Sequence, residues 1–126
     1  MSSKYKPGED AIAHFVTFSV VGWIDVFSRE IYKEIFVNSL KYCQESKGLT
    51  LHAWVIMTNH VHLILSTNTN KIEDIVRDLK KYTSKQIIKA IQENPTESRK
   101  ERMLNLFNFA GKSNSNNKQY QFWKQD

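Results

Sequence analysis

One stretch, residues 54–65, limits what this chain can fold into. It reads WVIMTNHVHLIL, two apolar runs rich in β-branched residues on either side of the polar pair Thr58-Asn59. Two such runs joined by a short polar turn predict a β-hairpin. Side chains alternate across a strand, so His60 and His62 leave one face of the hairpin and Val61 leaves the other. The hairpin therefore predicts a sheet that carries two imidazoles on one face.

Apolar periodicity predicts the remaining elements around this hairpin. Strands are predicted at 11–21, 49–57, 60–66 and 120–123, and helices at 29–46, 71–92 and, shorter, 96–108. The order β-α-β-β-α-(α)-β is the split βαβ, or ferredoxin-like, pattern. We therefore expect an α+β sandwich with a four-stranded antiparallel sheet and two main helices on one face. Val61, Leu63 and Leu65 should pack beneath the helices, which leaves the histidines facing outward.

Length and composition favour one domain. The 126 residues suffice for one hydrophobic core and are few for two. We expect a single domain over residues 1–126, with a flexible arm at 1–10 and a flexible loop at 111–118. No apolar run approaches the length of a membrane span, so a cytoplasmic protein without a membrane partner is expected. Cys43, the single cysteine, excludes an internal disulfide and is expected to be a small buried hydrophobe.

The positive charge points to a polyanionic partner. The net charge is +5 and the pI is near 9.3. Lys80, Lys81, Lys85 and Lys89 fall largely off the apolar stripe of the predicted helix at 71–92. They would form a ridge able to follow a phosphate backbone. The same lysines are equally compatible with a solvated helix face that serves only solubility.

The histidine pair has a functional and a structural interpretation. Two imidazoles two residues apart on one strand can share a divalent cation, or each can be satisfied by a backbone carbonyl in a half-buried sheet. A hydrolase of the His-x-His-x-Asp-His kind is excluded, because residues 63–65 supply neither Asp nor His. A structural zinc site needs four ligands, and only His14 and His52 remain as further histidines.

The chain resembles a known family at these residues. The sequence MTNHVHLIL at 57–65 looks like the HUH motif (histidine, bulky hydrophobe, histidine) of single-tyrosine transposases of bacterial insertion sequences, especially the REP-associated tyrosine transposase branch. Further similarity lies in HFVTF, AWVIMTNH, LKKYTS and FW, which begin at His14, Ala53, Leu79 and Phe122. The resemblance covers nearly the whole chain.

The resemblance implies DNA transposition through strand transfer at single-stranded, often hairpin-bearing, element ends. It implies that His60 and His62 hold Mg²⁺ or Mn²⁺, which polarises the scissile phosphate. A tyrosine hydroxyl then attacks phosphorus, giving a 5′-phosphotyrosine and a free 3′-OH. Mg²⁺ prefers oxygen ligands, so a further ligand and the DNA phosphate must complete its shell. The family forms dimers with shared sites, and we therefore expect a homodimer.

The sequence also departs from the family. There, the nucleophilic tyrosine and the side chain that completes the metal site lie on a helix after the last strand of the sheet. This sequence ends at Asp126, so we expect a chain that is truncated relative to the family and does not nick DNA alone. Tyr82, beside Lys80 and Lys81, is the candidate substitute. The competing interpretation is an aromatic at the rim of the core, with its hydroxyl at the surface.

Two further functions remain open. One is a non-catalytic module, derived from the transposase, that binds single-stranded nucleic acid. The other is a dimerisation domain in which the predicted strand at 120–123 pairs across a two-fold axis. An RNA-recognition-motif protein has the same outline, but histidines stand here in place of its stacking aromatics. Trp23, Trp54 and Trp123 suit either base stacking or a core, and the sequence does not separate these.

Overall fold

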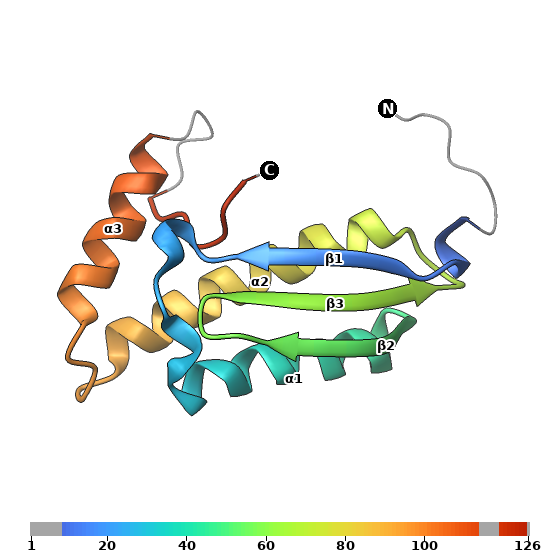
Figure 1. The fold of residues 1–126 in the computed structure, drawn as a ribbon, viewed down its shortest axis with the longest axis horizontal. Helices are drawn as coiled ribbons and strands as arrows, with labels where there is room; N and C mark the ends of the chain where they lie inside the picture. Colours follow the sequence, from blue (N-terminus) through green and yellow to red (C-terminus); the bar gives the residue numbers. More distant parts are fainter. Residues whose placement is uncertain (1–8, 114–118, 126) are drawn as a thin grey trace.

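Three antiparallel strands form one sheet that is covered by helices on one side only (Figure 1). The strands are β1 (His14–Ser19), β2 (Leu49–Ile56) and β3 (His60–Thr67), in the order β1-β3-β2. This computed structural model describes residues 9–113 and 119–125. The central strand is β3, so the histidine-bearing strand is hydrogen-bonded on both sides.

Two long helices cover the rear face of the sheet. They are α1 (Glu30–Ser46) and α2 (Ile72–Glu93), which pack against each other and lie behind the strands (Figure 1). The third helix, α3 (Lys100–Lys112), lies at the end of the sheet where β3 begins. In the described residues, three short 3₁₀ segments complete the elements: η1 (Glu9–Ala11), η2 (Val21–Trp23) and η3 (Val26–Ser28). The expected α+β class is confirmed, and the predicted helices at 29–46 and 71–92 match α1 and α2 to within one residue.

The core lies between the helices and the rear face of the sheet. Val61, Leu63 and Leu65 on β3 are at most 1% exposed, and apolar residues at helical spacing on α1 and α2 close over them. Burying each such side chain contributes about 1.5–3 kcal/mol. An aromatic cluster fills the end of the core nearest α3; its members are Phe18, Phe27, Phe36, Phe107, Phe122 and Trp123.

The expected fourth strand is not formed within the described residues, and this corrects the four-stranded prediction. The segment at 120–123 makes one isolated bridge, between Val20 and Trp123. Phe122 and Trp123 are both buried, at 1% and 6% exposure. Two backbone hydrogen bonds flank this bridge, from the N–H of Val21 to the carbonyl of Phe122 at 2.8 Å and from the N–H of Lys124 to the carbonyl of Ser19 at 2.7 Å, and the pairing extends no further among the described residues. Trp123 instead donates its indole N–H to Thr83 Oγ1 at 3.0 Å, which anchors the segment to α2.

Part of the predicted arm and part of the predicted loop belong to helical segments of the described residues. Residues 1–8 of the predicted arm lie outside the described residues, whereas Asp10 belongs to η1 and accepts a hydrogen bond from the backbone N–H of Ile72 at 3.0 Å. Of the predicted loop at 111–118, Gly111 and Lys112 belong to α3, and residues 114–118 lie outside the described part. Asp10 thus satisfies a free N–H group at the start of α2.

The hairpin between β2 and β3 has a short loop, and backbone hydrogen bonds from residues outside the hairpin hold that loop in place. Met57 donates its N–H to the carbonyl of His60 at 2.8 Å, so Thr58 and Asn59 form a two-residue loop. Backbone N–H groups of Val20 and Phe27 donate to the carbonyls of Asn59 and Thr58, at 3.0 and 2.9 Å. The turn that leads into the histidines is therefore fixed by the segment that follows β1.

A buried ion cluster ties the connection between α2 and α3 to the start of α1. The Glu97 side chain is fully buried and accepts from Arg29 Nε at 2.8 Å, from Arg99 Nε at 3.0 Å and from the Tyr32 hydroxyl at 2.8 Å. Arg99 also contacts the carboxylate of Asp25 at 2.6 Å. Burial alone would raise the pKa of Glu97, but the donated hydrogen bonds outweigh it and lower that pKa to about 2.

Candidate metal and nucleic-acid site

The two histidines lie side by side on the uncovered face of the sheet. His60 and His62 are partly exposed, whereas Val61 between them is fully buried against the helices. Their ring centroids are 4.7 Å apart, with the planes inclined at 77°. The alternation of a strand produces this arrangement, and the structure places both imidazoles as the sequence pattern predicts.

Each imidazole is held through its Nδ1 atom. His60 Nδ1 lies 2.7 Å from Asn59 Oδ1, and His62 Nδ1 lies 3.0 Å from Thr17 Oγ1. An amide oxygen only accepts, so His60 carries its proton on Nδ1 when neutral, and its Nε2 keeps a free lone pair. A hydrogen bond on one ring nitrogen is the usual way in which proteins orient a histidine ligand for metal binding through the other. The pair therefore suits a cation bound through Nε2 atoms.

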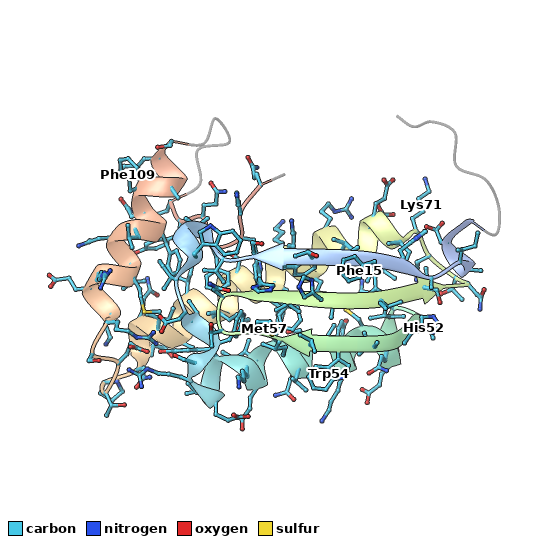
Figure 2. All side chains as sticks on the ribbon, viewed as in Figure 1. Phe15, His52, Trp54, Met57, Lys71 and Phe109 are labelled. Atoms are coloured by element: carbon cyan, nitrogen blue, oxygen red, sulfur yellow. The ribbon has the colours of Figure 1, made fainter. Side chains whose placement is uncertain are left out.

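Two exposed aromatic rings flank the histidines. Phe15 on β1 stacks on His62, with centroids 5.4 Å apart and an interplanar angle of 19°. Trp23 in η2 meets His60 edge to face at 6.2 Å. Phe15 is 66% exposed and Trp23 55%, and Figure 2 shows Phe15 on the uncovered side of the sheet.

The other two histidines do not join this pair. His52 occupies an irregularity in β2 and lies 2.8 Å from the hydroxyl of Ser66. His14 pairs with Leu65, which places it on the helix-covered face of the sheet. In the described part of the chain, no group of three His, Cys, Asp or Glu side chains could hold a metal ion. The pair thus offers two nitrogen ligands and leaves the rest of a coordination shell to water or phosphate oxygens, which fits a cation that keeps several oxygen ligands.

A basic groove runs between α2 and the C-terminal segment 119–125. Its volume is about 1050 Å³, and Glu93 is the one acidic residue among those that line it. Its cationic residues are Arg77, Lys80, Lys81, Lys85, Lys89 and Lys124. The structure therefore brings the four predicted lysines of α2 together and adds Lys124, which the sequence pattern did not single out. Lys124 Nζ lies 5.5 Å from the centre of the Trp23 ring.

The structure does not bring Tyr82 to the histidines. Tyr82 is 56% exposed and lines a separate pocket between α1 and α2, together with Tyr42 and the buried Cys43. These helices cover the face of the sheet opposite to the histidine pair (Figure 1). Burial raises the pKa of the Cys43 thiol, as expected of a packing residue. No tyrosine of the described residues contacts either imidazole.

Sequence reasoning missed the residues that orient and flank the pair. Thr17 is 45 positions from His62 along the chain, and only the register of β1 against β3 pairs them. Asn59 directly precedes His60, so its side chain was the one local signal available. Phe15 reads as an ordinary strand residue until its exposure is known.

Comparison with known proteins gives one family. The family model described as "Transposase IS200 like" matches residues 10–121, and no curated protein matches the sequence. Among the described residues, no helix combines the length and the apolar character that crossing a membrane requires.

Proposed function

Because this chain belongs to the IS200-like transposase family, whose function is DNA transposition, we propose that it binds single-stranded DNA ends with a phosphate at the His60–His62 pair. The observation that carries the proposal is the pair of Nδ1 hydrogen bonds, to Asn59 and Thr17. These bonds hold two neighbouring imidazoles in place and leave their Nε2 atoms for a ligand. The family match confirms the resemblance to single-tyrosine transposases; the REP-associated branch stays a prediction.

His60 and His62 would hold Mg²⁺ or Mn²⁺. When bound, such a cation polarises a phosphate oxygen and offsets the charge that develops on the departing oxygen. Asn59 and Thr17 keep the rings oriented, and the hydrogen bond that each ring makes strengthens it as a ligand. The sheet beneath the pair is fully packed, so the ring positions are set by a rigid strand.

The basic groove would hold the DNA backbone. Lys80, Lys81, Lys85 and Lys89 line one wall, and Lys124 lines the other. Each ammonium that replaces a counterion on a phosphate adds salt-dependent affinity. A single strand or a hairpin end is the form that the family resemblance favours, and an open groove of this kind binds it without base-specific contacts.

The family reaction needs a tyrosine hydroxyl that the described residues do not bring to the histidines. In that reaction the hydroxyl oxygen bonds to phosphorus, the bond from phosphorus to the 3′ oxygen breaks, and the 3′-OH leaves with a proton. Tyr32 is buried and bonded to Glu97, and Tyr42 and Tyr82 lie on the other side of the sheet. We therefore propose that the described part binds DNA and metal and does not itself complete cleavage.

The second candidate function is a non-catalytic module for binding or dimerisation. The edge of the sheet at β2 favours a homodimer. β2 is an edge strand; Trp54 and Val55 on it are 51% and 46% exposed, and Met57 directly after it is 48% exposed. Figure 2 shows Trp54 and Met57 at this edge. An exposed apolar edge is a ready surface for pairing with a second copy. Light scattering should give a dimer mass, and Trp54→Lys should give a monomer. A monomeric wild type would remove the dimer from the proposal.

The central experiment measures Mn²⁺ and DNA binding in matched histidine variants. Mn²⁺ binding is followed by electron paramagnetic resonance, and binding of a fluorescein-labelled hairpin oligonucleotide by anisotropy at about 50 mM salt. His60→Ala and His62→Ala should each lower Mn²⁺ affinity at least tenfold, whereas His52→Ala, the matched control, should leave it unchanged. Equal Mn²⁺ affinities in all three variants would refute the metal site.

Cleavage is read in the same samples. We expect DNA binding without a covalent protein–DNA adduct. An adduct that Tyr82→Phe abolishes would show Tyr82 to be the nucleophile, supplied to the histidines from a second copy. Binding that His60→Ala does not change would favour the non-catalytic module, and absence of binding would leave the dimerisation role.

A further inference from the structure

Trp23 adopts a backbone conformation that its side chain does not favour. Its φ is +56°, and it follows Gly22 at φ +67°. Left-handed backbone is uncommon for residues other than glycine, asparagine and aspartate, and it is rare for a bulky ring. Residues held in this way concentrate at functional sites, where the surrounding structure fixes them. At Trp23, the backbone N–H donates to the carbonyl of Val20 at 3.0 Å.

The conformation places the indole between the histidine pair and the basic groove. On one side the Trp23 ring meets His60, and Asn59 bridges the two, because its Oδ1 faces His60 and its amide donates to the Trp23 carbonyl at 3.4 Å. On the other side Lys124, a residue of the groove wall, lies over the indole. Trp23 is thus where the groove reaches the histidines.

Phe15 occupies the corresponding place beyond His62. Its ring is stacked on the imidazole and is the more exposed of the two flanking aromatics. The order across the uncovered face is therefore Trp23, His60, His62 and Phe15. Neither flanking ring belongs to the core, which is built from other aromatic residues.

We infer that Trp23 and Phe15 are positioning residues on which unpaired bases stack, one on each side of the phosphate at His60 and His62. The inference rests on the proposed function. Trp23 takes the base on the groove side, and the Lys124 ammonium, which lies over the indole in the free protein, moves to the adjoining phosphate. Stacking of this kind tolerates any base, because each has an aromatic face, and it requires a single strand, because bases in a duplex already stack on each other.

The test combines protein variants with abasic DNA. The ligand is a fluorescein-labelled single-stranded oligonucleotide with Mn²⁺ present, in which one nucleotide at a time is replaced by an abasic spacer. Loss of one base stacked on an aromatic ring weakens binding on the order of 5- to 150-fold. Trp23→Ala should weaken binding of the intact strand to this extent, Trp23→Phe should weaken it less, and Phe109→Ala should not change it. Phe109 is a matched control, since it is 72% exposed on α3, away from the sheet (Figure 2).

The decisive result is non-additivity. In the wild type, an abasic spacer at one position should weaken DNA binding about as much as Trp23→Ala does. In the Trp23→Ala variant, the same spacer should not weaken DNA binding any further. Phe15→Ala should show the same behaviour with a spacer on the other side of the bound phosphate.

The outcomes separate the inference from the function on which it rests. Suppose that the wild type binds Mn²⁺ and DNA. If the losses from the spacer and from Trp23→Ala then add up, or if Trp23→Ala binds DNA as tightly as Phe109→Ala, the stacking role alone is overturned. A wild type that binds no single-stranded DNA overturns both. Circular dichroism melting of each variant shows whether a loss of DNA binding is due to unfolding. If Trp23→Ala does not fold, DNA binding by Trp23→Phe is compared with the wild type instead.

Discussion

The Glu97 cluster and the histidine pair differ in how many of their polar atoms already have hydrogen-bond partners. The Glu97 cluster is closed: Arg29, Arg99 and Tyr32 all donate to a carboxylate without solvent exposure. The histidine pair is half-open, because each imidazole has one hydrogen-bonded nitrogen and lies on an uncovered face. A closed cluster has nothing left to bind, so it serves the fold. A cluster that fixes its groups on one side and leaves them free on the other is ready for a ligand.

The largest expected effect comes from opening the closed cluster. Glu97→Gln should lower the free energy of unfolding by about 3 kcal/mol, because two guanidinium groups lose a buried partner. Urea denaturation at pH 7 measures this, and Mn²⁺ binding should be unaffected. Glu101→Gln on the exposed first turn of α3 is the matched control and should stay within about 0.5 kcal/mol of the wild type. An equal loss in both variants would contradict the role given to Glu97.

The same cluster should reveal itself in the pH dependence of stability. The folded-state pKa of Glu97 is lowered from its ordinary value of 4.5 to about 2. The stability that the ionised carboxylate contributes is therefore present at neutral pH and is lost as the pH falls from 4.5 towards 2. The difference in unfolding free energy between wild type and Glu97→Gln should shrink from about 3 kcal/mol at pH 7 to near zero at pH 2. Urea titrations at intermediate pH values follow this change. A constant difference would show that Glu97 does not act through its charge.

An intermediate effect is expected from the fixed side of the half-open pair. Thr17→Val removes the hydroxyl next to His62 Nδ1 and keeps the β-branched shape, so Mn²⁺ affinity should fall about 10- to 100-fold. Unfolding free energy should change little, since the Thr17 side chain lies on the uncovered face. Thr50→Val, an exposed threonine on β2, is the control. Equal Mn²⁺ affinity in the two variants would assign Thr17 no part in orienting His62.

The smallest effect concerns the backbone at Trp23. Trp23→Gly should be about 1 kcal/mol more stable than Trp23→Ala, because left-handed backbone costs an L-residue roughly that much. Both variants should bind single-stranded DNA equally weakly. At Phe109, in helix α3, the same pair of substitutions should give the opposite order, since glycine is disfavoured there. If Trp23→Gly were the less stable variant, the strain at this position would be disproved.

Tertiary packing determined the conformation of the last apolar segment. Tyr120-Gln-Phe-Trp123 has the composition of a strand, and local propensity cannot tell a strand from a segment that fills a core. Phe122 and Trp123 both pack into the aromatic cluster, and the segment pairs with the end of β1 over one bridge only. The prediction failed where a contact distant in sequence outweighed the local pattern.

The sequence by itself determined the two faces of β3 and the two long helices. Both follow from periods of two and of 3.6 residues, which a few neighbouring side chains define. Only the tertiary structure showed what surrounds the histidines: Thr17 and Phe15 from β1, Trp23 from the turn after it, and Lys124 from the far end of the chain. These contacts depend on strand register and on how the C-terminal segment packs. Local patterns place the two histidines on one face, and long-range pairing brings the surrounding residues to them.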